Sequence, residues 1–198
     1  MSVRKCSPRG MTFPRMTLVG VLGADNALYS AEFRATERLF ALLEQVAGRA
    51  GRGALAGEVL VQTDFPEHPL YKALVGHDYD RYAEALLAER RSLGLPPFAY
   101  LALLAAEAKT RAPMMSFLDA AAERGRVVIA SHACRCELYP PAPAGLARRA
   151  GMERGQVLVQ SNDRRSLQAF LPLWRSELEQ LGERRVRWSI DVDPLSFA

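Results

Sequence analysis

Apolar and polar positions in the first third of the chain follow the pattern of a parallel α/β unit. Residues 17–23 form a short, apolar, β-branched run, which indicates a buried strand. In residues 32–46, large apolar side chains recur at helical spacing and predict an amphipathic helix. A second strand is expected in residues 57–63. Strand, helix and strand in this order predict one βαβ unit of a parallel sheet.

The following stretch, residues 66–94, has a helical pattern that Pro66 and Pro69 interrupt. Its apolar residues predict two connecting helices, with Asp78 as the N-cap of the second. The sequence Gly94-Leu-Pro-Pro then ends the helical pattern. The chain is therefore expected to have three segments, which are residues 1–65, the connecting helices in residues 66–94 and a C-terminal domain in residues 95–198.

The C-terminal segment repeats one pattern in two successive halves. A proline-rich loop at residues 139–143 separates the halves. The order β-α-β-β-α-β is typical of a split βαβ, ferredoxin-like α+β sandwich. The expected elements are strands at residues 98–108, 126–138, 156–160 and 186–193, and helices at residues 114–124 and 164–181.

Composition narrows the class of protein without identifying a partner. Hydrophobic residues make up 49% and charged residues 24%, which is typical of a globular domain rather than a disordered chain. The chain lacks an apolar run near the ~20 residues of a membrane span, and its first residues do not resemble a signal peptide. We therefore expect a cytoplasmic protein with no membrane partner. The net charge of +4 permits an anionic partner, and only three of the 26 basic residues are lysines.

The three cysteines do not predict a metal site. Cys134 and Cys136 are separated by one residue, whereas zinc ligands usually have two to four residues between them. His132 lies close by, but a fourth ligand at suitable spacing is missing. We therefore expect Cys6, Cys134 and Cys136 to remain reduced thiols in the cytosol, with no metal bound to them.

The segment from Gln45 to Arg52 has the most informative motif. Gln45 and Arg49 are four residues apart and Arg49 and Arg52 are three apart, so near a helix end these side chains project together. Gly48 lets a ligand or a second chain approach the backbone closely. Two convergent guanidinium groups can stabilise the charge that develops on a γ-phosphoryl group. The alternative is a solvated, arginine-rich helix end, where cations favour the helix dipole.

This Q-x-x-G-R-x-G-R pattern, which follows a strand and a helix, resembles motif VI in the second RecA-like lobe of superfamily-two helicases. Residues 18–38, with Leu-Val-Gly-Val-Leu-Gly-Ala-Asp-Asn-Ala-Leu-Tyr-Ser, resemble the primosomal protein N′ (PriA) family of replication-restart helicases in particular. So do Leu95-Pro-Pro-Phe, Tyr139-Pro-Pro-Ala-Pro and Asp191-Val-Asp-Pro. The resemblance covers nearly all of the chain from Phe13 onward. It implies a partial RecA-like lobe followed by a ferredoxin-like C-terminal domain.

The resemblance also implies a function and its residues. The family consists of ATP-dependent 3′-to-5′ DNA helicases that restart stalled forks and load the primosome. Gln45, Gly48, Arg49 and Arg52 would contact ATP and its Mg²⁺ complex, with Arg49 and Arg52 as catalytic arginines. The implied partners are forked and single-stranded DNA, single-stranded DNA-binding protein and other primosome proteins.

Other parts of the family pattern are missing from this sequence. Arg9-Gly-Met11-Thr12-Phe-Pro resembles a family motif V in which His and Asp are replaced by Met11 and Thr12, which casts doubt on its contacts with nucleotide and DNA. The sequence contains neither the G-x-x-x-x-G-K-[ST] loop, nor D-E-x-H, nor the family's zinc-binding cysteine clusters. We therefore expect a severed helicase portion that does not hydrolyse ATP alone. The alternative is a non-catalytic module that binds DNA or single-stranded DNA-binding protein.

Arg164 and Gln168 match the family positions that bind the acidic C-terminal tail of single-stranded DNA-binding protein. They are four residues apart at the expected start of a helix, where a carboxylate is favoured. The alternative is an exposed polar first turn.

Asp25 has two interpretations as well, since it could link nucleotide to DNA or serve as an ordinary turn residue. His68 in Pro-Glu-His-Pro is expected to begin a helix.

Overall fold

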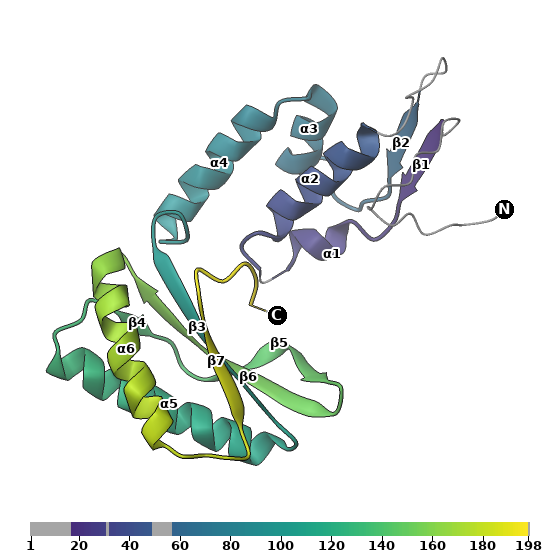
Figure 1. The fold of residues 1–198 in the computed structure, drawn as a ribbon. Helices are drawn as coiled ribbons and strands as arrows, with labels where there is room; N and C mark the ends of the chain where they lie inside the picture. Colours follow the sequence, from purple (N-terminus) through teal and green to yellow (C-terminus); the bar gives the residue numbers. More distant parts are fainter. Residues whose placement is uncertain (1–16, 31, 49–56, 198) are drawn as a thin grey trace. The chain divides into compact units, whose positions relative to one another are not determined.

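The computed structural model describes residues 17–30, 32–48 and 57–197 (Figure 1). The chain separates into two compact units, Met1–Ala85 and Leu86–Ala198. The division falls inside helix α4 (Tyr79–Ser92). Among the described residues, every helix is too short or too polar to span a membrane.

The first unit contains the predicted strand, helix and strand. β1 (Leu18–Val21) and β2 (Glu58–Val61) pair in parallel, with Val19 opposite Val59. Between them in the sequence lie the one-turn α1 (Asp25–Leu28) and the longer α2 (Ala35–Ala47). α2 buries one apolar face, as its periodicity predicts. The buried side chains of that face are Ala35, Leu39, Phe40 and Leu43.

Two helices follow β2 in the first unit, as the spacing of apolar residues predicts. His68 begins α3 (Pro69–Gly76), because its Nδ1 accepts a hydrogen bond from the backbone N–H of Leu70 at 3.2 Å. Asp78 begins α4 in the same way, with its Oδ1 accepting from the N–H of Arg81 at 3.2 Å. The Tyr82 ring stacks on Phe40 of α2 at 5.2 Å between ring centroids. The predicted N-caps are therefore confirmed.

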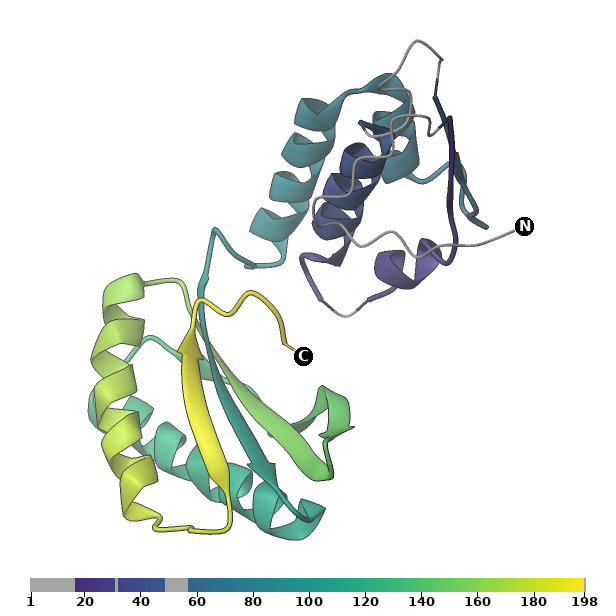
Figure 2. The ribbon, with the colours of Figure 1, turned by 45° about the vertical axis from the view of Figure 1, so that its right-hand side comes forward.

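The second unit contains β3 (Tyr100–Ala108), α5 (Arg111–Ser131), β4 (Glu137–Leu138), β5 (Ala142–Arg149), β6 (Met152–Ser161), α6 (Arg164–Gln180) and β7 (Arg187–Val192). The strands form an antiparallel sheet, and α5 and α6 lie on one face of it (Figure 2). The strand order is β4-β6-β3-β7, and β5 pairs with the part of β6 that β4 leaves uncovered. β6 leads into α6 after two residues, and β3 leads into α5 in the same way.

The core of the second unit lies between this sheet and its two helices. Alternate residues of β3 and β6 point toward the helices, as the two-residue period of a strand requires. Trp174 of α6 is fully buried there, and its Nε1 donates to the carbonyl oxygen of Ala121 in α5 at 2.8 Å. That hydrogen bond satisfies a buried donor and fixes the spacing of the two helices.

The expected strand at residues 126–138 is wrong over most of its length. α5 continues to Ser131, and only Glu137–Leu138 form a strand. Gly125 resembles a helix breaker in the sequence, and the β-branched residues after it favour a strand. In the fold, however, Val128 is buried in the core, and Gly125 lies against Trp174. Tertiary packing therefore outweighs the local preference.

The proline-rich loop is also shorter than expected. β5 begins at Ala142, inside the loop, and pairs with β6, with Ala142 opposite Gln156. β6 begins at Met152, four residues before the expected start of its strand. β5 contains Pro143 and Gly145, which are typical of loops, and the first part of β6 contains charged residues, so neither segment shows the apolar run that predicts a strand.

Candidate functional site

The first candidate site is the motif at the end of α2, which the structure describes in part. Gln45 lies in the last turn of α2 with an exposed side chain. Gly48 ends the helix, and its N–H donates to the carbonyl oxygen of Glu44 at 2.9 Å. Arg49 and Arg52 lie outside the described residues. The structure therefore places the exposed amide of Gln45 at a helix end. The prediction that Arg49 and Arg52 project together with Gln45 stays a prediction.

Asp25 lies where the chain leaves β1 and accepts hydrogen bonds from two later elements. Its Oδ1 accepts from Thr63 Oγ1 at 2.5 Å and from the Tyr71 hydroxyl at 3.2 Å. Its Oδ2 accepts from the backbone N–H of Asp64 at 2.8 Å. The carboxylate thus joins the end of β1 to the residues after β2 and to α3. These partners lie 38 to 46 positions away in the sequence, so Asp25 does more than an ordinary turn residue would, and a link from nucleotide to DNA stays untested.

The pKa values of Asp25 and Tyr71 are shifted in opposite directions in this arrangement. The hydrogen bonds from Thr63 and Asp64 hold the pKa of Asp25 below its ordinary value, because they stabilise the charged carboxylate. Burial raises the pKa of Tyr71, and the neighbouring carboxylate of Asp25 raises it further. Around neutral pH, the pair therefore consists of a charged acceptor and a neutral donor.

The second candidate site is the beginning of α6 in the second unit. Asp163 is the N-cap, and its side chain accepts from the N–H of Arg165 at 3.1 Å. Arg164 and Gln168 are both exposed, and their four-residue spacing places them on one face of the helix. The structure therefore brings the two predicted residues together at a helix start.

Two further residues border Arg164, and sequence reasoning did not identify their contacts. The Asp193 Oδ2 lies 3.7 Å from Arg164 Nη2, and the guanidinium carbon of Arg164 lies 5.7 Å from the centroid of the Tyr100 ring. Asp193 follows β7, and its N–H donates to the carbonyl oxygen of Leu101 at 2.9 Å. Asp193 belongs to the Asp191-Val-Asp-Pro motif, which is the only sequence signal that pointed to it.

This cluster can exchange one carboxylate for another. The side chain of Arg164 is 59% exposed and that of Asp193 is 50% exposed, so their ion pair is strongly solvated. Such exposed pairs contribute about 0–1 kcal/mol. An incoming carboxylate could replace Asp193 at low cost and would also benefit from the positive end of the α6 dipole.

Of the three cysteines, the structure describes Cys134 and Cys136, whereas Cys6 lies outside the described residues. Cys136 Sγ lies 4.0 Å from the Ser166 hydroxyl, and burial raises the pKa of the Cys136 thiol. Neither Cys134 nor Cys136 is in a disulfide. Within residues 17–30, 32–48 and 57–197, no three His, Cys, Asp or Glu side chains cluster as metal ligands.

Comparison with known proteins gives a family match over the second unit. Residues 91–195 match the family described as "Primosomal protein N C-terminal domain". The matched range includes Arg164, Gln168, Tyr100 and Asp193.

The curated relatives match over a longer range. A protein from Haemophilus influenzae named "Replication restart protein PriA" is 39% identical over 187 residues, which is 94% of this chain and 25% of that protein. A protein of the same name from Synechocystis is 36% identical over 189 residues, 96% of this chain and 22% of that protein. The chain thus spans about a quarter of the length of these relatives.

Among solved structures, a de novo designed protein overlaps 48% of this chain and 97% of its own chain. Its TM-score is 0.35 and its identity 8%, which is too low to support an argument about fold or function.

Proposed function

Because the chain belongs to the primosomal protein N C-terminal domain family, we propose that it works as the C-terminal portion of a PriA-type replication-restart helicase. In this proposal, the complete assembly is an ATP-dependent 3′-to-5′ DNA helicase that restarts stalled forks and loads the primosome. The similarity to replication restart proteins over 94–96% of the chain supports this function. Forked and single-stranded DNA and other primosome proteins are the proposed partners, in the cytoplasm.

We further propose that the two units correspond to two known folds. The parallel pairing of β1 with β2 around α2 supports a partial RecA-like helicase lobe for residues 1–65. The strand order β4-β6-β3-β7, with both helices on one face, supports a ferredoxin-like sandwich for residues 95–198. Residues 66–94 would connect the two.

The residues of this chain do not by themselves form a site for ATP and Mg²⁺. Gln45 and Gly48, exposed at the end of α2, are suitably placed to form one wall of such a site together with Arg49 and Arg52. The sequence has no phosphate-binding loop and no D-E-x-H carboxylates. In this proposal, those parts belong to the other lobe of the complete helicase, and the zinc-binding cysteines to a further part.

The function that this chain can perform alone is partner recruitment, which is also the alternative role of a non-catalytic module. The observation that supports it is the exposed pair Arg164 and Gln168 at the N-terminus of α6. An arginine fork, an amide and a positive helix end are together suited to a C-terminal carboxylate. We propose that the pair binds the acidic tail of single-stranded DNA-binding protein.

A titration of a labelled acidic peptide with a free C-terminus into the 198-residue chain tests this site. Loss of a charge-assisted hydrogen bond costs about 1.5–3 kcal/mol, so Arg164→Ala should weaken binding by about tenfold or more. The matched control is Arg175→Ala, because Arg175 lies on the same helix and is 68% exposed. The same peptide with a C-terminal amide should bind more weakly. Equal effects of the two substitutions would show diffuse charge attraction instead of a site.

A further inference from the structure

Two half-buried thiols lie on one side of the short segment that joins α5 to β4. Cys134 and Cys136 both pack against the core of the second unit, whereas the side chain of Arg135 between them is exposed. This alternation means that the two sulfur atoms face the same side of the chain. The Cys134 thiol lies 3.9 Å from the carbonyl oxygen of His132, and both thiols are free. The segment therefore presents two thiols that are suitably placed to react with each other.

The backbone of Arg135, between the two thiols, is bonded to the start of α6. Its N–H donates to the Ser166 hydroxyl at 2.6 Å, and its carbonyl oxygen accepts from the Ser161 hydroxyl at 2.5 Å. The Ser161 hydroxyl oxygen also accepts from the N–H of Asp163, the N-cap of α6, at 3.1 Å. Arg135 is thus connected to residues on both sides of Arg164, and its position affects how Arg164 is held.

A disulfide between Cys134 and Cys136 would change the backbone between them. In an extended segment, Cα atoms two residues apart are separated by about 6.6–7.2 Å. A disulfide usually holds its two Cα atoms about 5.5–6 Å apart. Closure of the disulfide therefore bends the chain at Arg135, which lies between the sulfurs. The bend turns the N–H and the carbonyl group of Arg135 away from Ser166 and Ser161.

We infer that Cys134 and Cys136 form a redox switch that controls the proposed tail-binding site at the start of α6. When the thiols are reduced, Ser161 and Ser166 hold the helix start through Arg135, and the tail binds. When they form a disulfide, these hydrogen bonds are lost and the tail binds more weakly. This inference rests on the proposed function, because tail binding is the property that the switch would control.

Glutathione disulfide is the oxidant of the proposed reaction. The Cys134 thiolate attacks one of its sulfurs, a mixed disulfide forms, and one glutathione leaves as a thiolate that takes up a proton. The Cys136 sulfur then attacks the Cys134 sulfur, loses its own proton, and expels the second glutathione. Two protein thiols and one glutathione disulfide thus give one protein disulfide and two glutathione thiols. Burial raises the pKa of the Cys136 thiol, which disfavours its thiolate, so we assign the first attack to Cys134.

The switch is expected to rest in its reduced state. A strained disulfide has a more oxidising potential than an ordinary structural one, so the glutathione thiols of a reducing cytosol keep it open. Only an excess of glutathione disulfide closes it, and added thiol opens it again by the reverse exchange. This property agrees with the expectation that Cys134 and Cys136 are ordinarily reduced thiols.

Mass spectrometry and peptide titration of the same samples test the switch. All samples of the 198-residue chain carry Cys6→Ser, which leaves Cys134 and Cys136 as its two thiols. In excess glutathione disulfide, the mass should fall by about 2 Da, because each thiol gives up one hydrogen. The affinity for the labelled acidic peptide should fall by about fivefold, which corresponds to the contribution of a typical N-cap. Excess dithiothreitol should restore the mass and the affinity.

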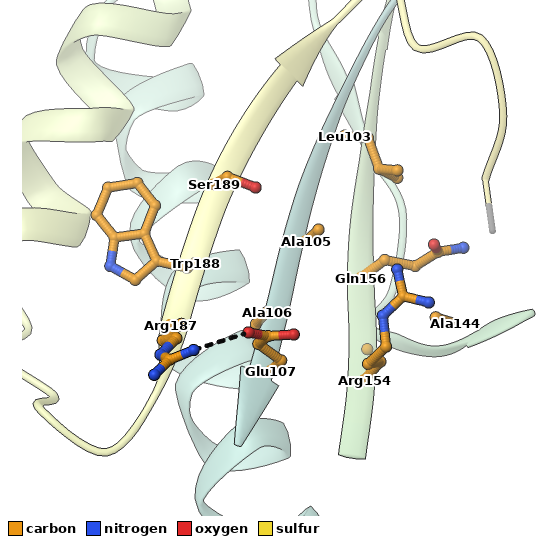
Figure 3. Close-up of a pocket in the computed structure, with 11 residues that line it drawn as sticks. Leu103, Ala105, Ala106, Glu107, Ala144, Arg154, Gln156, Arg187, Trp188 and Ser189 are labelled. Carbon is orange, nitrogen blue, oxygen red and sulfur yellow. Dashed lines mark ion pairs between the residues drawn. The ribbon is translucent and has the colours of Figure 1, made fainter. Parts of the chain in front are cut away.

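Three variants serve as controls and as a test of the connection to α6. Cys134→Ser/Cys136→Ser cannot form the disulfide, so its peptide affinity should be that of the reduced chain and should not respond to the oxidant. Ser166→Ala removes the acceptor of the Arg135 N–H and should weaken peptide binding without any oxidant. Its matched control is Ser189→Ala, because Ser189 lines a cavity of about 370 Å³ in the middle of the sheet (Figure 3). This control should leave the affinity unchanged.

Hydrogen exchange separates failure of the switch from failure of the proposed function. The amide hydrogen of Arg135 should exchange faster in the oxidised chain, because it loses its acceptor on Ser166. If the reduced chain binds no tail peptide, the proposed function fails, and exchange at Arg135 still decides whether the disulfide acts on α6. Equal exchange in the two states would overturn the switch. So would unchanged peptide affinity after the disulfide has formed, or addition of glutathione without closure of the disulfide.

Discussion

Gly125→Ala tests whether the long α5 is held by its packing against α6. A Cβ atom at this position would lie 2.9 Å from Trp174 Nε1 and 3.3 Å from Trp174 Cε2, and it would overlap Leu138 Cδ1. The Trp174 side chain is fully buried, and its Nε1 donates to the carbonyl oxygen of Ala121, so the indole cannot withdraw. The Leu138 contact is the end of a flexible side chain and can give way more easily.

Two effects of opposite sign decide the outcome of this substitution. Alanine is favoured over glycine inside a helix by up to about 1 kcal/mol. An additional methyl group in a packed core costs about 1–3 kcal/mol. Because Trp174 is fixed, we expect the second effect to win and the free energy of unfolding to fall by up to about 2 kcal/mol.

Urea unfolding followed by tryptophan fluorescence measures this change in the second unit, because both tryptophans lie there. The midpoint should fall with little change in the slope m. Gly76→Ala in α3 is the control, since no atom lies within 4 Å of the added Cβ. Followed by circular dichroism, it should stabilise the first unit by about 0.4–1 kcal/mol. If Gly125→Ala also stabilises, the packing argument is wrong.

Asp25→Asn should destabilise the first unit at pH 7, because an amide cannot accept all three hydrogen bonds as well as a carboxylate does. The pKa of Asp25 is lowered in the fold, so the stability that its carboxylate contributes is present above the unfolded pKa and is lost as pH falls. The difference between variant and wild type in urea unfolding should therefore shrink below about pH 4. A difference that stays constant with pH would contradict this. Asp193→Asn removes the carboxylate beside Arg164 and should raise affinity for the tail peptide by up to about fivefold, while weaker peptide binding would show that Asp193 positions Arg164.

Elements with strong hydrophobic periodicity could be predicted from the sequence because their own residues determine them. α2 buries one face at helical spacing and begins at Ala35, three residues after its expected start. α6 begins at Arg164, as expected, with Asp163 as its N-cap. The strands of the βαβ unit are short apolar runs between turn residues. In each case local sequence and tertiary packing favour the same structure.

The errors fall where distant residues decide the structure. The extension of α5 depends on Trp174, which lies 49 positions beyond Gly125 in the sequence and packs against it. β5 exists because it pairs with β6, and its own residues are mostly exposed. Neither dependence leaves a periodic signal in the segment concerned, so no inspection of that segment alone could reveal it.

The candidate sites divide in the same way. Arg164 and Gln168 could be chosen from the sequence, because helical spacing alone places them on one face. Tyr100 and Asp193 come from the beginning of β3 and the residues after β7, so their contact with Arg164 depends on the sheet order.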